Sequence, residues 1–454
     1  MRRGLWWLLA LSVIVLCMVT KLSVTAQRTE GSVLVASLTE DGIQIYAVDT
    51  AGEQTLVTSL PEFRVGEPVN EDLWYLGTTS SLTVSLDGSR LAFTAQRSGE
   101  WALFVYELAA DALLEAAIPT DSRPVWSPDS DAILLAGGNI PPDDDYVFEV
   151  AAERLVRLTN TSDYDERRFN WLPDSSGLFY VGLYSECETC DATQALYLVS
   201  RDGSETRLLA QAAALTPADS YDTVCHPTWS EPNQRIYFII GCVGGGTQSD
   251  EYLYSVDLSG DVRAEISGGL NSLYPNEYSV SSRSIHPNTL TNDLYLTIGS
   301  QGGGEEGRGL LNWRILHLLS TNEVAPVYER TMQNDDLDSS SMSPDGASMA
   351  LVTYGKGAAS NGFLEVVDLA TGQLVVGRDA TLLDVCDVSW EDEHTLFYTV
   401  DSTGECVVDR GPRSVWVQDT ASGATQEVTG GLGDHVSIVR QVVVTSPIVV
   451  TPTP

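Results

Sequence analysis

LYSVD (Leu253–Asp257) is one copy of a short apolar run, ending in an acid, that returns along this chain of 454 residues. LFVYE (Leu103–Glu107) and VWVQD (Val415–Asp419) are further copies, and eight units of this kind can be traced. Another β-like apolar run precedes each copy by some ten to twenty residues. Because no single unit can bury its own faces, neighbouring units must stack and share a core.

Turns containing Ser-Pro-Asp separate the first two strands of each unit. The clearest are WSPD (Trp126–Asp129) and MSPDG (Met342–Gly346). Proline sets φ for a type I turn, and the acid or glycine after it accepts turn geometry, so the motif predicts a hairpin. Successive turns lie 42 to 57 residues apart, which is typical of four-stranded propeller blades with long loops. Degenerate copies are Leu86–Gly88, Leu172–Asp174, Ser230–Pro232, His286–Asn288 and Trp390–Asp392.

The first unit is incomplete, and this sets the expected number of blades. Second, third and fourth strands fit between Val33 and Val57, but no opening strand precedes them. Since a closed ring has no free edge, we expect a strand within Val436–Val444 to complete the first blade. The sequence therefore predicts an all-β fold, a single β-propeller over residues 27–445 with eight four-stranded blades. Seven blades is the alternative, if the divergent unit around Pro287 is an insertion.

Packing between the blades is visible in two patterns. Second strands such as Ile236–Ile239 are apolar on both faces, as expected for strands lying between neighbouring sheets. Four tryptophans occupy one equivalent position just before the turn, and we expect them to pack between blades rather than to stack on a ligand. They are Trp126, Trp171, Trp229 and Trp390.

Both ends of the chain differ from the repeats. Two arginines precede an apolar run from Leu5 to Val19, which is shorter than the ~20 residues needed to span a bilayer. Small residues up to Ala26 suit a signal peptidase, so residues 1–26 are predicted to be a secretory signal peptide, with an uncleaved N-terminal anchor as the alternative. Residues 446–454 are rich in Thr and Pro and predict an extended tail.

The charge of the chain restricts its partners. Lys and Arg number 25 and Asp and Glu number 63, which gives a formal net charge of −38. Such a surface repels phosphate backbones and anionic lipids, so nucleic-acid binding is excluded and membrane contact is expected only through the N-terminal segment. Cations and basic protein segments are the natural attractants, although the acids also serve to keep an exported protein soluble.

The six cysteines after the signal region indicate export, because disulfides persist in oxidising compartments. Two of them each lie four residues before an equivalent tryptophan, and two others follow those tryptophans by 13 and 16 residues. Equivalent spacing in two units predicts one disulfide in each. Structural bridges are favoured over zinc or redox chemistry. The expected pairs are Cys225 with Cys242, Cys386 with Cys406, and a local bridge between Cys187 and Cys190.

These motifs resemble a known family. The Trp-Ser-Pro-Asp and Ser-Pro-Asp-Gly turns, each followed by an apolar strand and then an aromatic strand ending in Asp, are similar to the WD40-like repeat of TolB-type β-propellers. The resemblance extends from about Gly31 to about Val444, with two or three units that match well. It implies a largely non-catalytic protein that contacts other proteins of the cell envelope. Because the shared motif is structural, it carries over no binding residue.

Catalytic motifs do not stand out. No Gly-x-Ser-x-Gly sequence occurs, so the hydrolase half of a prolyl-oligopeptidase arrangement is not indicated. No two histidines have the spacing of a helical metal site, and we expect each one in a turn or at a sheet edge rather than as a ligand. The five are His226, His286, His317, His394 and His435.

Acidic residues gather in the segments that lead into each first strand. In a propeller these segments return towards the axis, so we expect them to surround one mouth of the central channel. Converging carboxylates there would focus a negative potential able to hold Ca²⁺ or to attract an Arg- or Lys-bearing segment. A plain turn-forming role for Asp is the alternative. The residues of this acidic mouth are Asp121, Asp163, Asp165, Asp222, Glu277, Asp335, Asp336, Asp338, Asp384 and Asp434.

Two main classes of function follow from these features. The leading prediction is a secreted or envelope-associated, non-enzymatic propeller that acts as a protein-interaction or ligand-binding module through the acidic mouth. No cofactor is expected beyond Ca²⁺, and the partner would be an envelope or extracellular protein with a basic segment. The alternative is a propeller hydrolase or lyase that acts on glycans or peptides with paired channel carboxylates. A purely structural envelope protein is the third possibility.

Overall fold

The computed structural model describes residues 32–441, except 40, 67–69, 71, 78–81, 117, 137–143, 161–166, 185–192, 217–220, 243–249, 303–309, 320–322, 334, 356–361, 378–384, 402–412, 431 and 433–435. The expected signal peptide and the Thr/Pro-rich tail both lie outside these residues. Within the described part of the chain, no helix has the length and apolar character that a membrane span requires.

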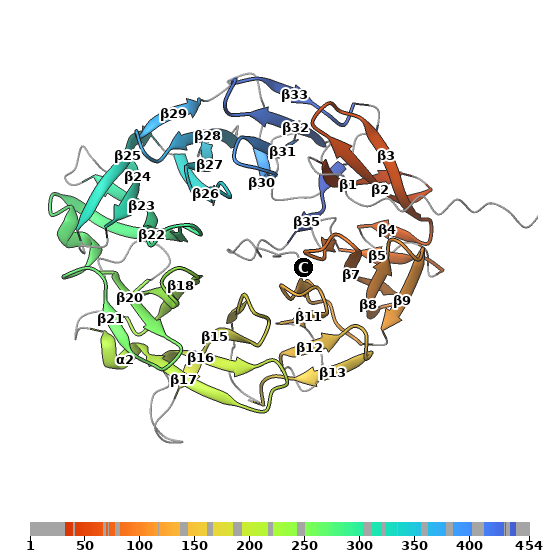
Figure 1. Cartoon of the computed structure of the whole chain (residues 1–454), viewed down its shortest axis with the longest axis horizontal. Coiled ribbons are helices and arrows are strands. Elements are labelled where there is room, and N and C mark those ends of the chain that lie inside the picture. Colours follow the sequence, from red (N-terminus) through yellow and green to blue (C-terminus); the bar gives the residue numbers. More distant parts are fainter. Residues whose placement is uncertain are drawn as a thin grey trace, which may run out of the picture.

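The described chain forms a ring of eight antiparallel four-stranded blades, and Figure 1 looks along its axis. This confirms the predicted all-β propeller and its eight blades. The strands nearest the axis are β34 (Val436–Ile438), β6 (Thr83–Val84), β10 (Val125–Trp126), β14 (Arg167–Trp171), β18 (Val224–Ser230), β22 (Glu277–Pro287), β26 (Asp335–Met342) and β30 (Val385–Trp390), in blades 1 to 8.

The other strands follow outward in the same blade order. Second strands are β1 (Ser32–Thr39), β7 (Arg90–Arg97), β11 (Ala132–Leu135), β15 (Gly177–Tyr184), β19 (Arg235–Ile240), β23 (Leu294–Gly302), β27 (Ser348–Gly355) and β31 (Thr395–Asp401). Third strands are β2 (Gly42–Asp49), β8 (Glu100–Glu107), β12 (Tyr146–Glu149), β16 (Thr193–Ser200), β20 (Tyr252–Asp257), β24 (Leu310–Leu318), β28 (Gly362–Asp368) and β32 (Arg413–Asp419). Outer strands are β3 (Gln54–Leu60), β9 (Ala112–Ala116), β13 (Arg154–Arg157), β17 (Thr206–Gln211), β21 (Val262–Ala264), β25 (Val324–Gln333), β29 (Gln373–Val376) and β33 (Thr425–Glu427).

The first blade is completed from the other end of the chain, as predicted. β34 pairs antiparallel with β1, with Val35 opposite Ile438, and the Val439 N–H donates to the Leu34 carbonyl at 2.8 Å. The next strand, β35 (Arg440–Gln441), then pairs in parallel with β6 of blade 2, which was not predicted. The C-terminal segment therefore joins blade 1 to blade 2. The unit around Pro287 is a complete blade, so the seven-bladed alternative is wrong.

Blade 2 carries an addition that the repeat pattern did not predict. β4 (Phe63–Val65) and β5 (Trp74–Leu76) pair in parallel, and β5 in turn pairs antiparallel with β7. The Phe63 ring packs at 5.0 Å, edge to face, against both Phe93 and Phe104 of the blade itself. This small aromatic core covers the outer part of the junction between blades 1 and 2.

Apolar side chains are buried mainly between blades. β19 is buried at all six positions, and its Phe238 shares one hydrophobic cluster with Phe179 of the preceding blade. The equivalent tryptophans pack in the same wedges. The Nε1 of Trp171 donates to the Val125 carbonyl of the preceding blade at 3.3 Å, which fits the predicted packing role. Two short helical segments, α2 (Ala212–Leu215) and the 3₁₀ turn η2 (Leu270–Leu273), lie in links between blades.

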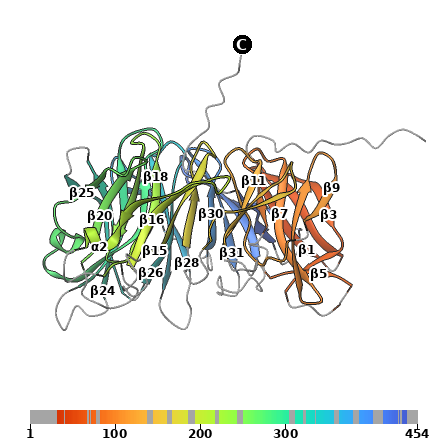
Figure 2. The ribbon, with the colours of Figure 1, turned by 90° about the horizontal axis from the view of Figure 1, so that it is seen from below.

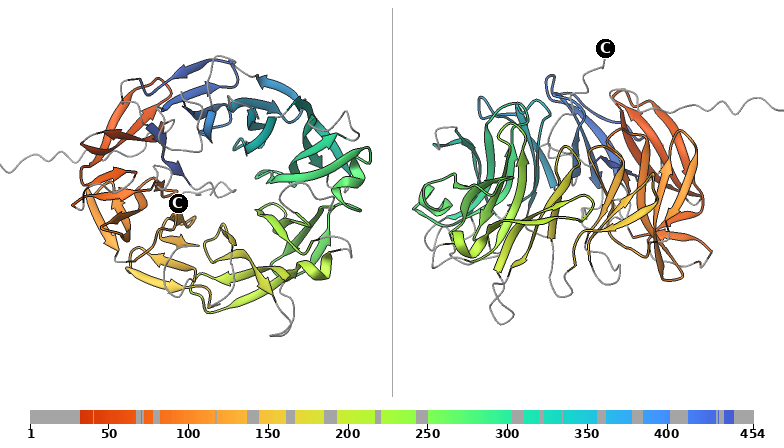
Figure 3. Two further views of the ribbon diagram at one scale, coloured as in Figure 1. Left: turned by 180° about the vertical axis from the view of Figure 1, so that it is seen from behind. Right: turned by 60° about the horizontal axis from the view of Figure 1, so that its bottom comes forward.

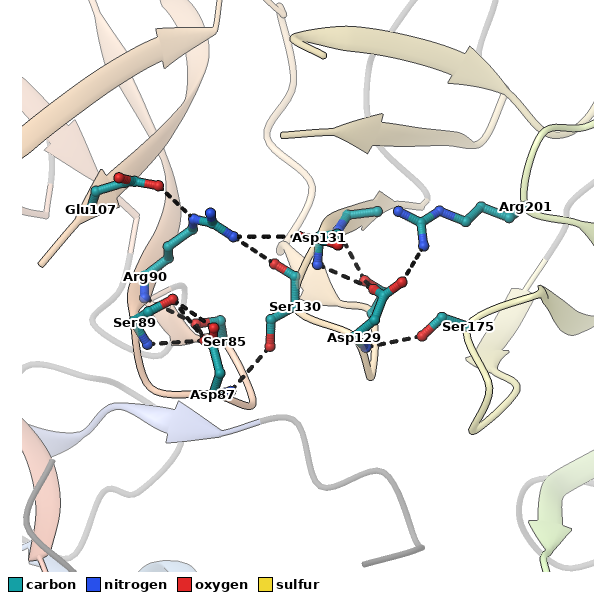
Figure 4. Close-up of polar contacts among 12 residues, drawn as sticks. Ser85, Asp87, Ser89, Arg90, Glu107, Asp129, Ser130, Asp131, Ser175 and Arg201 are labelled. Atoms are coloured by element: carbon teal, nitrogen blue, oxygen red, sulfur yellow. Dashed lines mark hydrogen bonds and ion pairs between the residues drawn. The ribbon is translucent and has the colours of Figure 1, made fainter. Parts of the chain in front are cut away.

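The Ser-Pro-Asp turns also connect one blade to the next (Figure 4). The Asp87 N–H donates to Ser130 Oγ at 3.1 Å, and the Asp129 N–H donates to Ser175 Oγ at 3.0 Å. Arg90 of blade 2 reaches the Ser130 carbonyl of blade 3 at 3.0 Å. Although burial raises the pKa of Asp87, hydrogen bonds from Ser85 and Ser89 lower it below its ordinary value. These turns therefore link blade 2 to blade 3 and blade 3 to blade 4 through polar contacts.

The antiparallel order gives the ring two distinct faces, seen from the side in Figure 2 and tilted in Figure 3. Turns between first and second strands, and between third and fourth strands, lie on what we call the turn face. Links from second to third strands, and from each blade to the next, lie on the opposite face, which we call the loop face. The predicted acidic mouth belongs to the loop face.

Candidate ligand-binding site on the inner strands

Five consecutive innermost strands contain a register shift at nearly the same level. A β-bulge leaves a residue outside the hydrogen-bond ladder and re-aims its side chain, and bulges are frequent beside active sites. In blades 4, 5 and 6 the residues at these bulges are Arg168, His226 and Arg283, which we call the inner-strand site. The shifts lie between Arg167 and Asn170 in β14, Cys225 and Thr228 in β18, Ser282 and Ser284 in β22, Leu337 and Ser339 in β26, and Val385 and Val388 in β30.

Two of these bulges hold their residue in a strained backbone conformation. Arg168 has a φ of 58° and His226 a φ of 53°, in the left-handed region that favours glycine. Such a residue costs about 1–3 kcal/mol and persists only where its surroundings impose the geometry. Here the two bulges are linked by a hydrogen bond. The Nη1 of Arg168 donates to the Val224 carbonyl at 3.0 Å, two residues before His226.

Arg283 is positioned by an aromatic ring in its own blade. Its guanidinium lies 5.3 Å from the centroid of Trp313 on β24. The indole lies against Gly299 of β23, where an added Cβ would be 2.6 Å from the ring. Only glycine therefore leaves room for the indole in this position. Arg283 itself remains exposed.

A buried carboxylate from blade 5 fixes the backbone beside Arg283. Glu251 is 4% exposed and accepts hydrogen bonds from both the N–H and the Oγ of Ser282, each at 2.6 Å. Burial raises the pKa of Glu251, while these hydrogen bonds and the charge of Arg283 oppose the rise. Glu251 thus acts as a positioning residue for the β22 bulge.

Both histidines on these inner strands are held in the neutral form. Burial, followed by the positive charges of Arg168 and Arg283, lowers the pKa of His226 from 6.5 to about 4. Burial, followed by the influence of His226, lowers the pKa of His286 to about 4 as well. At neutral pH the inner-strand site therefore carries two guanidinium charges beside neutral imidazoles. Local positive charge thus lies on the innermost strands of a chain whose net charge is −38.

The positions of the histidines agree with the prediction in part. We expected turns or edges, and His226 and His286 lie on β18 and β22, which are edge strands of their sheets. His317 lies on the third strand β24, where it stacks at 4.6 Å on Tyr295. His394 does lie in the turn between β30 and β31. His435 is outside the described residues.

The structure describes three of the ten side chains of the predicted acidic mouth. Asp121 is exposed and Asp222 is half-buried, both on the loop face. Glu277 is ion-paired, since its Oε2 accepts from Arg314 Nη1 at 3.0 Å and the Arg314 side chain is 4% exposed. Asp335, Asp336 and Asp338 belong to β26, but their side chains are not described. Asp163, Asp165, Asp384 and Asp434 lie outside the described residues.

One predicted disulfide is present, and it adjoins the inner-strand site. Cys225 and Cys242 are bonded, with Cα atoms 6.3 Å apart, and Cys225 directly precedes His226. Cys386, at the β30 bulge, is also disulfide-bonded. Its expected mate, Cys406, lies outside the described residues, as do Cys187 and Cys190.

The inner-strand site was not identified from the sequence, although a signal exists. Arg168 and His226 each lie three residues before an equivalent tryptophan, Trp171 or Trp229. The shared offset places a basic or imidazole side chain at the same position of two neighbouring innermost strands.

The arrangement suits recognition of anionic oxygen atoms. Guanidinium groups donate paired hydrogen bonds to carboxylates, and a neutral imidazole beside them can accept a proton. Among the described residues, no group of three or more His, Cys, Asp or Glu side chains is placed to hold a metal ion. Ca²⁺ at the acidic mouth remains a prediction.

No family model matches this chain, and no curated protein matches it. Solved structures do match in shape. An oligogalacturonate lyase, solved in complex with manganese, gives a TM-score of 0.51 at 13% identity, covering 85% of this chain and 96% of the lyase. At this identity the likeness concerns the fold alone.

Two peptidases also match in part. A puromycin-hydrolysing peptidase from Mycobacterium tuberculosis gives a TM-score of 0.49 at 14% identity, covering 80% of this chain and 54% of the peptidase. A prolyl endopeptidase gives 0.43 at 12% identity, covering 95% of this chain and 54% of the enzyme. This chain thus spans about half the length of each peptidase.

Proposed function

We propose that this chain is an extracytoplasmic β-propeller that binds a carboxylate-bearing ligand at the inner-strand site. The observation that supports it most is the pair of exposed guanidinium groups, Arg168 and Arg283, on innermost strands of a chain with net charge −38. The Cys225–Cys242 disulfide supports an oxidising compartment. The Ser-Pro-Asp turns support a TolB-type repeat.

The two arginines attract an anionic ligand at short range, whereas the net charge of the chain repels it at long range. A hydrogen bond to a charged group contributes about 1.5–3 kcal/mol, so two guanidinium contacts give useful affinity. The net charge of −38 repels an anion at a distance, and salt screens that repulsion beyond a Debye length of about 8 Å at physiological ionic strength. Association should therefore become faster, not slower, as salt is added from a low concentration.

Calorimetric titration with two probes tests the proposal: a galacturonate trimer and a peptide with a free C-terminal carboxylate. At least one should bind the wild-type protein, and the double variant Arg168→Gln/Arg283→Gln should lose about 100-fold or more in affinity. Arg154→Gln is the matched control, because Arg154 lies on the outer strand β13 and pairs with Glu149. Absence of binding by both probes, or equal binding by the double variant, would overturn the proposal.

An enzymatic role at the same site is the second candidate, as a lyase acting on an acidic glycan. It is supported by neutral His226 beside two arginines, and the fold is shared with an oligogalacturonate lyase. Arginines that neutralise a uronate carboxylate acidify the adjacent C–H. His226 would accept that proton while the C–O bond at the next carbon breaks, and the departing oxygen would take a proton from water. This replaces the paired carboxylates that we expected for an enzyme.

The elimination leaves a conjugated double bond whose ultraviolet absorbance is a direct assay. Incubation of the galacturonate trimer with the wild-type protein should raise this absorbance. His226→Gln should remove the increase while trimer binding persists. A flat trace with the wild-type protein, under conditions in which calorimetry shows binding, would rule out the lyase and leave the binding module.

The acidic mouth is proposed as a separate contact on the loop face, for Ca²⁺ or for a basic segment of an envelope protein. Its support is the number of acids in the segments between blades, of which Asp121 is exposed. The triple variant Asp335→Asn/Asp336→Asn/Asp338→Asn should weaken Ca²⁺ binding and capture of a Lys-rich peptide. Unchanged binding of both would remove the acidic mouth from the proposal.

A further inference from the structure

Next to the inner-strand site, a group of three hydroxyls, two of them in contact with one imidazole, lies at the junction of blades 6 and 7. Ser284 and His286 lie two residues apart on β22 and so share a face, and Ser284 Oγ is 2.7 Å from His286 Nε2. Ser340 Oγ of β26 lies 2.7 Å from Ser284 Oγ and 2.9 Å from His286 Nε2. Thr297 of β23 completes this group, which we call the hydroxyl cluster, at 2.5 Å from Ser284 Oγ.

The cluster is only partly enclosed. Thr297 is 1% exposed and forms its floor, whereas Ser284, His286 and Ser340 are half-buried. Ser284 directly follows Arg283 on β22, so the first hydroxyl of the cluster comes from the residue next to the guanidinium group. The cluster therefore adjoins the inner-strand site on β22, and we call the two together the polar strip.

The chemistry of the strip changes along its length. Arg168 and Arg283 only donate hydrogen bonds, and they favour an anion. Hydroxyls donate one and accept up to two, and a neutral imidazole does one of each. Because His286 carries no charge at neutral pH, this end neither attracts nor repels ions. Groups that both donate and accept match neighbouring hydroxyls of a sugar, which have the same dual character. A peptide presents fewer such groups beside its carboxylate.

We infer that the ligand is an acidic sugar, with its carboxylate on Arg168 and Arg283 and its ring hydroxyls on Ser284, His286 and Ser340. This inference rests on the proposed function, and it specifies which class of carboxylate the site selects. The two blades contribute to it jointly, since Ser340 comes from blade 7 and the other contacts of the hydroxyl cluster come from blade 6.

The test compares four probes by calorimetry: a galacturonate trimer, the corresponding neutral galactose trimer, a carboxylate-terminated peptide and adipate. The trimeric acid should bind at least tenfold more tightly than the peptide and adipate, and the neutral trimer should bind weakest. Ser340→Ala should reduce affinity for the acid trimer about tenfold and leave adipate unchanged. Ser341→Ala is the matched control, because its side chain lies on the opposite face of β26.

The outcomes separate this inference from the proposed function. If adipate and the peptide bind as tightly as the trimer, and Ser340→Ala changes none of them, the sugar is excluded while the carboxylate site stands. If Arg168→Gln/Arg283→Gln changes no affinity, the proposed function itself fails. Ser284→Ala provides a second variant, and thermal unfolding of each variant shows whether the ring is intact. Loss of trimer affinity in a variant that unfolds like the wild type supports the inference.

Discussion

Ring closure by the C-terminal strand can be tested with two truncations. A chain ending at residue 435 lacks β34 and β35, whereas a chain ending at residue 441 keeps both. Val436, Ile438 and Val439 are 1%, 3% and 2% exposed in the closed ring. Burial of one such side chain contributes about 1.5–3 kcal/mol, so the three together contribute about 5–9 kcal/mol. Total stability of a domain is about 5–15 kcal/mol.

The shorter truncation should therefore lose most of its folding free energy, and blade 1 should have an open edge. Urea unfolding followed by tryptophan fluorescence measures the loss, and small-angle scattering should show a larger radius of gyration. The chain ending at 441 should unfold like the full-length protein. Equal urea midpoints for the two truncations would refute closure by β34.

Three further predictions follow from single features. Replacing Cys225 and Cys242 by serine should lower the free energy of unfolding by about 3 kcal/mol, because the bridge spans 17 residues; reducing agent should then affect the variant less than the wild type. Gly299→Ala should cost about 1–3 kcal/mol and weaken anion binding by displacing Trp313, whereas Gly430→Ala, with open space around it, should change neither. The pKa of His286 is about 4 in the folded protein and 6.5 in the unfolded chain, so the unfolded chain binds more protons between these pH values. The free energy of unfolding should therefore fall as pH drops from 6.5 to 4. His286→Gln should flatten that part of the plot of urea midpoint against pH.

The architecture could be predicted because it is encoded locally and repeatedly. Strands such as β19 are apolar on both faces, and this requires a neighbour on each side. The missing opening strand of the first unit, together with the valines after residue 436, predicted the closure between β34 and β1. By contrast, β4 and β5 have no Ser-Pro-Asp turn and no counterpart in other units, so their burial of Phe63 depends on contacts visible only in the folded protein.

The candidate site was harder to predict, since it depends on contacts between blades. The bulge at Arg168 is tied to the Val224 carbonyl, 56 residues away in sequence. Glu277 was expected among the acids of the channel mouth, but it pairs with Arg314, which lies 37 residues further on, on a third strand. Composition indicated an acidic surface and could not show that two arginines lie at bulges of innermost strands. Spacing relative to the tryptophans was the only local signal.

The pairing between β1 and β34 determines how the ring responds to tension. Because the two strands run antiparallel, with Val35 opposite Ile438, the start of β1 and the end of β34 lie side by side. A pull on the start of β1 and the end of β34 would then break the backbone hydrogen bonds one after another, which is peeling, rather than all together, which is shearing. Peeling needs much less force than shearing. The pairing of β34 with β1, inside blade 1, is therefore a place where such a pull would open the ring.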